Sequence, residues 1–342
     1  MKYRIAIMGT RGIPNHYGGF EQLAEHLAPG LVEAGHAVTV YNSHNHPYKG
    51  EYWNGVRIVH RYDPAKLGSA GQFIYDLGCL LHARSQQYDI ILQLGYTSSS
   101  VWGRLFPSGA VTIYNMDGLE WKRAKYSKMV RRFLLYAEGL AVRYGHHHIA
   151  DSRVIQSYLR EKYGIESEYI AYGATLFASA SREIGEDYFL TMARMEPENN
   201  IEMILEGFCG SVTSKKMVVI GNMENRFGRR LRERFGNDPR IIFTGAIYDQ
   251  QRLHGLKYFA SLYFHGHSTG GTNPSLLEAM ASEALIAAHD NCFNRSVLGG
   301  DAIFFKDAGH VRMLMESSLV IDGDVWRQHN LGRISSHTTS GA

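Results

Sequence analysis

Short apolar runs alternate with amphipathic segments along the chain, and the alternation restarts near residue 175. In the first half the runs lie at residues 3–9, 36–42, 56–62, 88–95, 111–117 and 147–152. In the second half they lie at residues 187–194, 215–222, 239–246, 260–266, 284–290 and 302–308. Buried strands that alternate with helices are typical of mainly parallel α/β sheets. The pattern predicts two Rossmann-like α/β domains facing across a cleft, at residues 1–172 and 173–330. We expect the polar tail at 331–342 to be disordered.

Length and composition narrow the class of protein. The chain has 342 residues, 44% hydrophobic and 20% charged, which describes a soluble globular protein with room for two domains. A net charge of +3 does not indicate nucleic acid. The three cysteines show no metal-ligand spacing and fit a reducing cytoplasm. No apolar run approaches the roughly 20 residues of a membrane helix, and we expect no signal peptide.

A glycine-rich loop, GTRGIPNHYGGFE at residues 9–21, joins the first strand to the first helix. It is not the dinucleotide fingerprint, because Arg11 stands where a glycine is required, and no Gly-Lys-Ser/Thr follows to make a P-loop. Two interpretations remain. The glycines only turn the chain, or backbone N–H groups at Gly18 and Gly19 meet a phosphate or sugar oxygen.

A second loop, at residues 264–283, carries a stronger signal. Asn273 and Pro274 are good helix-start residues, and the free N–H groups of a first helical turn attract anions. Glu278 follows one turn later, where its carboxylate can accept from two neighbouring hydroxyls, such as those of a ribose. The alternative is a capped helix with a solvated glutamate.

These two loops, together with NMDGLEWKR at residues 115–123, resemble the GT-B glycosyltransferases of family 4. More closely, they resemble the bacterial rhamnosyltransferases of polysaccharide assembly. The resemblance covers residues 1 to about 310. It implies a nucleotide-sugar donor bound by the second domain, with no metal and no cofactor in catalysis.

The resemblance also assigns donor-binding residues. Glu278 matches the second glutamate of the Glu-x7-Glu motif, which holds the ribose, while the first falls on Gly270. This loss suggests a donor with fewer hydroxyls, such as a 6-deoxy sugar. Arg194 matches the arginine that clamps the diphosphate, with a surface ion pair to Glu196 or Glu198 as its alternative. The expected donor-binding set is Gly18, Gly19, Arg194, Asn222, Tyr248, Gly270, Gly271, Thr272, Asn273, Ser275 and Glu278.

The lysine that relatives carry five residues after the arginine is Asn199 here. The diphosphate clamp therefore loses one positive charge. The backbone N–H groups of residues 271–275 would have to hold more of the phosphate.

On the acceptor side, Asp117 and Glu120 flank Gly118 and can orient an acceptor hydroxyl. Asp117 stands where many relatives carry a histidine, although a turn residue is the plain alternative. In the family's retaining reaction the donor's β-phosphate is thought to accept the proton. Asp117, Glu120 and Arg194 are then catalytic through positioning and electrostatic stabilisation rather than as bases.

Six of the eleven residues 122–132 are lysine or arginine. The cluster is either a solvated helix face or a surface that attracts an anionic membrane or a lipid diphosphate. Nucleic acid is not expected, because no recognised binding motif accompanies the cluster. Three adjacent histidines, His146–His148, cannot share one metal on a strand, and we interpret them as structural.

The favoured hypothesis is a cytoplasmic glycosyltransferase, peripheral at the inner face of the membrane, in cell-surface polysaccharide synthesis. It would move rhamnose from dTDP-rhamnose to a lipid-linked saccharide with retention of configuration. Alternatives are a UDP-hexose transferase, a nucleotide-sugar epimerase of the same fold and a non-catalytic sugar-nucleotide binder. The fourth is an NAD oxidoreductase, which the broken fingerprint at Arg11 argues against.

Overall fold

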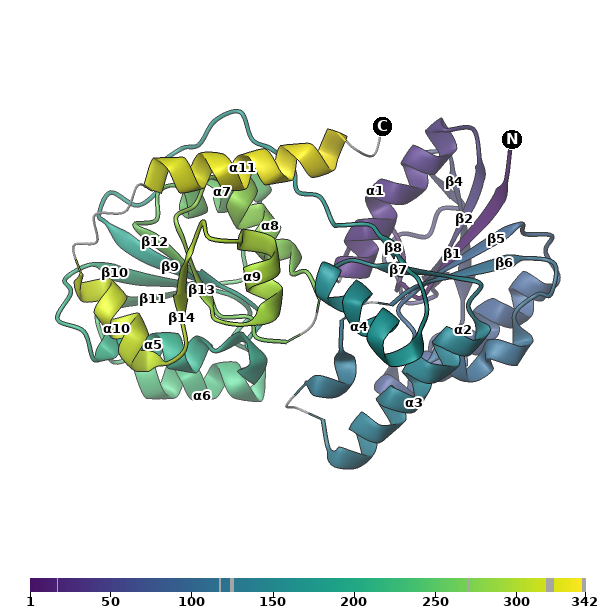
Figure 1. Ribbon diagram of the computed structural model, residues 1–342, viewed down its shortest axis with the longest axis horizontal. Helices are drawn as coiled ribbons and strands as arrows, with labels where there is room; N and C mark the ends of the chain where they lie inside the picture. Colours follow the sequence, from purple (N-terminus) through teal and green to yellow (C-terminus); the bar gives the residue numbers. More distant parts are fainter. Residues whose placement is uncertain (17, 117, 124–125, 270, 318–322, 340–342) are drawn as a thin grey trace. The chain divides into compact units, whose positions relative to one another are not determined.

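A computed structural model describes residues 1–16, 18–116, 118–123, 126–269, 271–317 and 323–339. The chain divides into two compact units, each with its own sheet and helices (Figure 1). The first unit comprises Met1–Trp121 and Tyr126–Ile170, and the second comprises Lys122–Lys125 and Ala171–Ala342.

The first unit is built on a sheet that has eight strands over the described residues, in the order β3-β4-β2-β1-β5-β6-β7-β8. All neighbouring strands are parallel except β3 and β4. The strands are β1 (Arg4–Met8), β2 (Ala37–Ser43), β3 (Tyr52–Trp53), β4 (Val56–Arg61), β5 (Ile90–Leu94), β6 (Val111–Asn115), β7 (His147–Ala150) and β8 (Glu168–Tyr169). The helices are α1 (Gly19–Glu33), α2 (Ser69–Arg84), α3 (Lys128–Tyr144) and α4 (Arg153–Tyr163).

Alternate residues of the central strand β1 enter two different hydrophobic clusters. Ile5 and Ile7 pack with α1, and Ala6 and Met8 pack with α2. Side chains of a strand point alternately to its two faces, so β1 is buried on both sides. This double burial explains why β1 is a continuous apolar run.

The second unit contains a six-stranded parallel sheet within the part of the chain that the structure describes, in the order β11-β10-β9-β12-β13-β14. The strands are β9 (Tyr188–Met192), β10 (Lys216–Ile220), β11 (Ile241–Gly245), β12 (Leu262–His265), β13 (Ile286–His289) and β14 (Ile303–Phe305). The helices are α5 (Ile201–Cys209), α6 (Arg226–Phe235), α7 (Gln250–Tyr258), α8 (Pro274–Ala281), α9 (Cys292–Leu298), α10 (Ala308–Glu316) and α11 (Gly323–Thr339).

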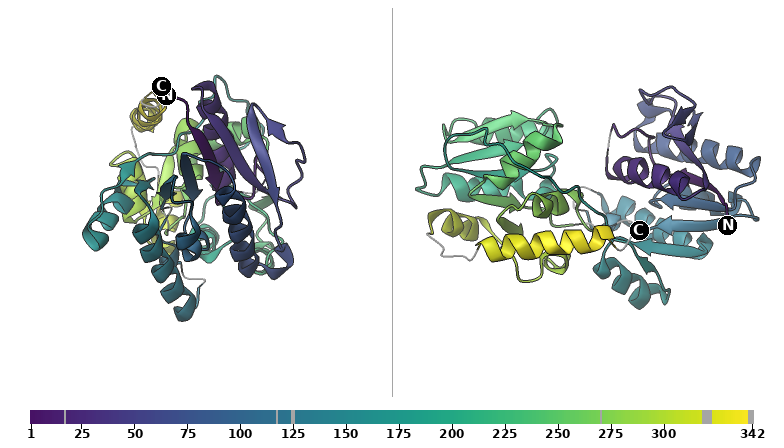
Figure 2. Two further views of the ribbon diagram at one scale, coloured as in Figure 1. Left: turned by 90° about the vertical axis from the view of Figure 1, so that its right-hand side faces the viewer. Right: turned by 90° about the horizontal axis from the view of Figure 1, so that it is seen from above.

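Helices cover both faces of this second sheet (Figures 1 and 2). One hydrophobic cluster joins the strands to α5, α6 and α10, and the other joins them to α7, α8, α9 and α11. In β10, Met217 and Val219 belong to the first cluster and Val218 and Ile220 to the second. The expected pair of parallel α/β domains is thereby confirmed.

The expectation of a disordered tail from residue 331 is wrong, because α11 continues to Thr339 beside α8 (Figure 1). Ile334 is fully buried in the cluster that includes α8. Asn330 is also buried and donates from Nδ2 to the Asp301 carbonyl at 2.9 Å. The buried side chains of Ile334 and Asn330 are among the contacts that dock this helix, whose last residues have the polar composition of a disordered tail.

Both sheets reverse their strand order beside their first strand. From β1 the chain builds outward through β2 and β4 on one side and through β5 on the other, and β9 is flanked in the same way by β10 and β12. Loops that follow the two strands at such a switch point diverge, and ligands of open α/β sheets bind there. The glycine-rich loop follows β1, and the second loop follows β12. No described helix is long and apolar enough to span a membrane.

Gly9 directly follows β1, and the fold requires a glycine at this position. Its φ is +86°, and a β-carbon there would lie 2.0 Å from the carbonyl oxygen of Leu94 in β5. We therefore expect Gly9→Ala to destabilise the protein by at least about 1–3 kcal/mol. Gly30→Ala, at an exposed position of α1 where a β-carbon meets nothing, is the control and should be neutral or stabilising. Urea unfolding of the two variants measures the difference, and equal midpoints would contradict this account of Gly9.

Candidate functional site

Side-chain hydrogen bonds join the loop after β9 to the loop after β12. Asn199 Oδ1 lies 2.8 Å from His267 Nδ1, and Asn200 Nδ2 donates to the Gly266 carbonyl at 2.8 Å. Ser268 Oγ donates to the Glu198 carbonyl, also at 2.8 Å. These bonds hold the two loops of the second switch point in one arrangement.

The loop after β12 is also held from the side of β13. Asn291 and Asn294 each donate from Nδ2 to the carbonyl oxygen of His267 at 3.0 Å. Asn291 also caps α9, because its Oδ1 accepts from the N–H groups of Phe293 and Asn294 at 3.0 Å. Amide side chains that follow β9 and β13 therefore hold the loop after β12 from both sides.

Arg194 lies in the loop after β9 and is exposed. No ion pair joins Arg194 to a carboxylate among the described residues, so the surface pair with Glu196 or Glu198 is not observed. Its carbonyl oxygen accepts from Asn199 Nδ2 at 2.7 Å, which fixes the backbone from which the guanidinium extends. The geometry offers an exposed cation at the carboxyl end of the sheet.

Asn199, at the position where the resemblance predicts a lysine, is a buried structural link. Its two amide atoms are used by the Arg194 carbonyl and by the His267 ring. A lysine cannot make this pair of bonds, because an ammonium group has no acceptor. The charge lost from the expected clamp is replaced by rigidity of the loop that carries Arg194.

The start of α8 has the expected cap. Asn273 Oδ1 accepts from Ser275 N at 2.9 Å and from Ser275 Oγ at 2.8 Å. Two of the backbone positions expected to face phosphate are therefore not available to it, because Pro274 has no N–H and that of Ser275 is bonded to the cap. Gly271 and Thr272 precede the cap, and Gly270 lies outside the described residues.

Glu278 projects from α8 and is 20% exposed at its side chain. Its Oε2 accepts a hydrogen bond from the ammonium group of Lys257 on α7 at 2.9 Å. Lys257 is not among the residues that the sequence analysis singled out. A lysine within an ordinary amphipathic segment gave no signal that it would be buried against this carboxylate.

Two further donor-side residues follow two neighbouring strands, β10 and β11. Asn222 comes after β10, is exposed, and accepts from Glu224 N through Oδ1 at 2.8 Å. Tyr248 comes after the edge strand β11 and is 83% exposed. Both lie at the carboxyl edge of the sheet, and Tyr248 is two strands away from β9.

In the first unit the glycine-rich loop is held by its own neighbours. Glu21 Oε1 accepts from Thr10 Oγ1 at 3.0 Å and from Arg11 N at 2.6 Å. Asn42 bonds both the N–H and the carbonyl of Ile13. Gly18 is the N-cap residue of α1, and a β-carbon on Gly19 would meet no protein atom within 4 Å. Packing of the protein accounts for Gly9 but not for Gly19.

A polar cluster that the sequence analysis missed lies near this loop. The guanidinium of Arg11 pairs with the buried carboxylate of Asp63, which follows β4. Asp76 of α2 is buried and accepts from Ser98, in the loop after β5, and from Gln72. Burial raises the pKa of Asp76 to about 6, although these hydrogen bonds oppose the shift. Arg11 and Asp63 are charged residues that follow the strands β1 and β4, which is the signal that could have found part of this cluster.

The predicted acceptor-side pair is only partly described. Asp117 lies outside the described residues, and Glu120 begins a short 3-10 helix, Glu120–Lys122, in which it is buried. The basic segment 122–132 does not form one helix, since α3 begins only at Lys128 after its cap Ser127. The basic residues of 122–132 therefore lie partly in this 3-10 helix and partly in the first turns of α3.

A second missed cluster supports this segment. Glu138 of α3 is buried and accepts from Tyr158, Tyr163 and Lys162, all on α4, at 2.6, 2.7 and 2.9 Å. The Lys162 ammonium also lies 5.4 Å from the ring centre of Trp121, next to Glu120. Burial, together with the nearby Glu138, raises the pKa of Tyr158 and of Tyr163. The cluster ties α3 and α4 to the end of the Glu120 segment.

Three histidines lie at the carboxyl ends of β12 and β13. Burial lowers the pKa of His265 to about 3 and that of His267 to about 4, and burial also lowers the pKa of His289. All three are therefore neutral at pH 7. No group of three or more metal-ligating side chains is found among the described residues.

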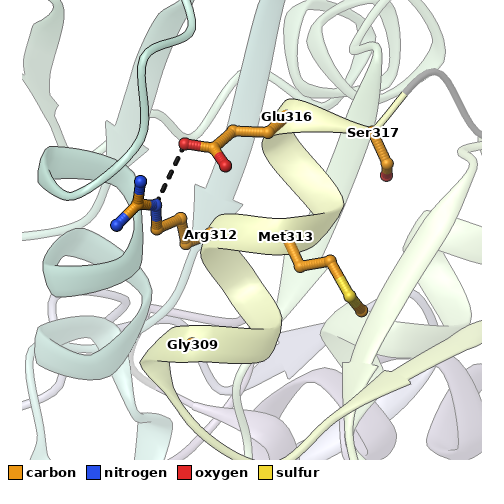
Figure 3. Close-up of a pocket in the computed structure, with 5 residues that line it drawn as sticks. All are labelled: Gly309, Arg312, Met313, Glu316 and Ser317. Atoms are coloured by element: carbon orange, nitrogen blue, oxygen red, sulfur yellow. Dashed lines mark hydrogen bonds and ion pairs between the residues drawn. The ribbon is translucent and has the colours of Figure 1, made fainter.

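A hollow of about 370 Å³ lies on α10, away from the loops described above (Figure 3). Arg312 donates from Nε to Glu316 Oε1 at 3.0 Å, and Val212 N donates to the same oxygen at 3.1 Å. The charged groups that line the hollow thus already bond within the protein, and none of the predicted site residues lines the hollow. The lining residues are Gly309, Arg312, Met313, Glu316 and Ser317.

The fold is that of the GT-B glycosyltransferases, which confirms the predicted architecture. Sucrose-phosphate synthase from Thermosynechococcus elongatus matches with a TM-score of 0.78 at 16% identity, over 98% of this chain and 94% of that chain. Trehalose-6-phosphate synthase from Burkholderia multivorans matches with 0.72 at 12%, over 98% and 95%. HepE from Anabaena, in complex with UDP and glucose, matches with 0.71 at 14%, over 99% and 95%.

The chain belongs to the family described as a domain of unknown function, DUF1972, whose model matches residues 2–175. No curated protein sequence matches it.

His265 should make stability depend on pH. Its pKa is lowered in the native state, so the unfolded chain binds the proton first as pH falls through about 6.5. The stability is fully present above this pH, and between pH 7 and pH 5 about 2 kcal/mol should be lost through this one group. His265→Gln should lose less stability than the wild type over this interval. His26→Gln, at an exposed position of α1, should lose as much. Urea unfolding at both pH values checks this, and equal losses for all three proteins would contradict it.

Proposed function

We propose that the protein is a glycosyltransferase that uses a nucleotide-diphosphate sugar, with the donor bound by the second unit. One observation carries the proposal. At the switch point of the second sheet, the exposed cation Arg194 and the capped start of α8 lie on loops that hydrogen bonds hold together. A cation and a helix N-terminus both favour phosphate. Glu278 supplies, one turn later, an acceptor for sugar hydroxyls.

The reaction breaks the bond between the anomeric carbon and the β-phosphate oxygen, and it forms a bond from that carbon to an acceptor oxygen. The proton of the acceptor hydroxyl goes to the departing diphosphate. Arg194 stabilises the charge that grows on the diphosphate as the bond breaks, which is where electrostatic catalysis is most effective. Both bond changes occur at one face of the sugar in a retaining reaction, and no protein base is required.

For the donor we propose dTDP-rhamnose, with a lipid-linked saccharide as acceptor. The support is the resemblance of residues 264–283 to rhamnosyltransferases and the absence of a glutamate at position 270. A UDP-hexose is the second candidate, favoured by the likeness to HepE, whose structure holds UDP and glucose. In the first unit, the partly exposed guanidinium of Arg11, held by the buried Asp63, offers hydrogen-bond donors to a saccharide acceptor.

The test is turnover of defined donors by the full chain. dTDP-rhamnose and UDP-glucose are incubated with and without a lipid-linked saccharide, and released nucleotide and products are identified by mass spectrometry. Transfer that requires acceptor supports the proposal, and the better donor decides between the two candidates. Altered sugar nucleotide without acceptor would indicate an epimerase, and binding without turnover would indicate a non-catalytic binder.

Arg194→Ala should slow sugar transfer more than it weakens binding of a nucleoside monophosphate. The leaving β-phosphate gains charge in the transition state, whereas a monophosphate lacks that group. We expect a loss of at least roughly tenfold to a hundredfold in kcat/KM, typical of one charged hydrogen bond. Arg160→Ala, at an exposed position of α4, is the control. Equal losses for transfer and for monophosphate binding would argue against this role.

Gly19→Val should fold normally, because a β-carbon at Gly19 meets no protein atom within 4 Å. If the glycine-rich loop passes close to substrate, the added side chain should reduce transfer strongly while isolated dTDP still binds to the second unit. Gly30→Val, at an exposed position in the last turn of α1, is the matched control. The affinity for dTDP, measured by calorimetry, and the transfer rate are compared between wild type and variants. Near-normal transfer by Gly19→Val would show that the glycine only turns the chain.

We further propose that the start of α3 binds the anionic inner surface of the membrane, where a lipid-linked acceptor would lie. Met129 is 81% exposed and Tyr136 62% exposed, and Lys128 and Arg132 are exposed beside them. Exposed apolar side chains next to cations are the pattern by which helices attach to anionic lipid. The protein would then be cytoplasmic and peripheral.

Replacement of Lys128 and Arg132 with glutamine should weaken binding to phosphatidylserine-containing vesicles. Attraction between exposed charges is screened over about 10 Å at 0.1 M salt, so the wild-type binding should also weaken as salt is added. Donor affinity should be unchanged. Vesicle flotation at low and high salt measures this. If the wild type does not bind vesicles at low salt, the basic cluster is only a solvated helix face.

A further inference from the structure

Lys257 is an unusual lysine, because it lies in the core of the second unit and is 2% exposed. Its ammonium group donates to Glu278 Oε2 at 2.9 Å, and Glu278 belongs to the neighbouring helix α8. Burial lowers the pKa of Lys257, and the negative charge of Glu278 raises it. An ammonium group at this depth is stable only with such a partner.

The pair leaves the two oxygens of the Glu278 carboxylate in different environments. Oε2 faces the buried ammonium, while no described residue donates a hydrogen bond to Oε1. The side chain of Glu278 is 20% exposed, so the carboxylate still reaches the surface at the carboxyl side of the sheet. A carboxylate with both oxygens free can accept from the 2′ and 3′ hydroxyls of one ribose, each on its own oxygen.

We propose that Lys257 positions Glu278 so that only Oε1 is presented to the nucleotide, and that the site holds one hydroxyl of the nucleotide's sugar. The proposal rests on the proposed function, in which Glu278 binds that sugar. A 2′-deoxyribose has only the 3′ hydroxyl, so the site accepts a 2′-deoxynucleoside diphosphate with little loss. Lys257 is thereby a specificity-determining residue for the class of nucleotide.

The experiment compares UDP with 2′-deoxy-UDP, which differ only in the 2′ hydroxyl, by calorimetry on the full chain near pH 7.5. We expect the wild type to bind both within about threefold. A second charged hydrogen bond would instead favour UDP by roughly tenfold to a hundredfold. A wild-type preference for UDP of tenfold or more would overturn the proposal without any variant being needed.

Lys257→Met tests the role of the lysine itself, because methionine nearly matches its length and removes the charge. With Oε2 released, the preference for UDP should rise to about tenfold. The control is Lys215→Met, at the amino end of β10, which should leave the ratio of affinities unchanged. A merely structural role for Lys257 would lower both affinities equally, and an unchanged ratio in Lys257→Met would overturn the proposal.

Failure of the proposed function has a different signature. If neither nucleotide binds the wild type, the nucleotide site itself is wrong and the inference falls with it. If both bind and Glu278→Gln changes neither affinity, Glu278 does not hold the nucleotide and the inference is overturned, although a nucleotide site remains. A raised preference for UDP in Lys257→Met alone supports both.

Discussion

The reversal of strand order beside β9 is the constraint on which the second-unit site depends. β10 and β12 lie on opposite sides of β9, so the loops that follow β9 and β12 diverge, and nothing in the sheet itself holds them together. Amide side chains supply this link: the buried Asn199 bonds to His267, and the half-buried Asn200 bonds to the Gly266 carbonyl. The exposed cation Arg194 and the start of α8 therefore extend from a fixed frame. The amide residues of these loops therefore fix the loop conformation, and they add no charge to the site.

The two cations Arg194 and Lys257 of this site differ in their exposure to solvent. Arg194 is exposed and has no carboxylate partner among the described residues, whereas Lys257 is buried against Glu278. The lysine expected in the phosphate clamp is replaced by an amide, while a lysine not expected at all fixes the carboxylate. A buried ion pair adds little net stability but is costly to break, which suits a group whose orientation matters. At this site Lys257 thus orients Glu278, while Arg194 has no ion pair with a carboxylate among the described residues.

Much of the fold could be predicted from the sequence because both sheets are buried on two faces. Strands such as β1 and β10 are then continuous apolar runs. The first residue of a capped helix such as α8 can be predicted from its cap residue and the proline that follows it. The strands β3 and β8 are only two residues long, which is too short to show the alternating pattern of a strand. Helix α11 was missed because its composition is mostly polar, although side chains such as Ile334 and Asn330 are buried and dock it. The Arg11–Asp63 and Lys257–Glu278 pairs were missed because each joins residues that are far apart in sequence, which only the topology brings together.

The most direct test of the account is hydrogen exchange of the full chain with and without saturating dTDP. If the nucleotide lies at the second switch point, amides of residues 193–199 and 271–278 should exchange more slowly when dTDP is bound. Those of α10, which lines the hollow in Figure 3, should not change. Protection confined to α10, or to the first unit, would contradict the placement of the donor on which the account rests.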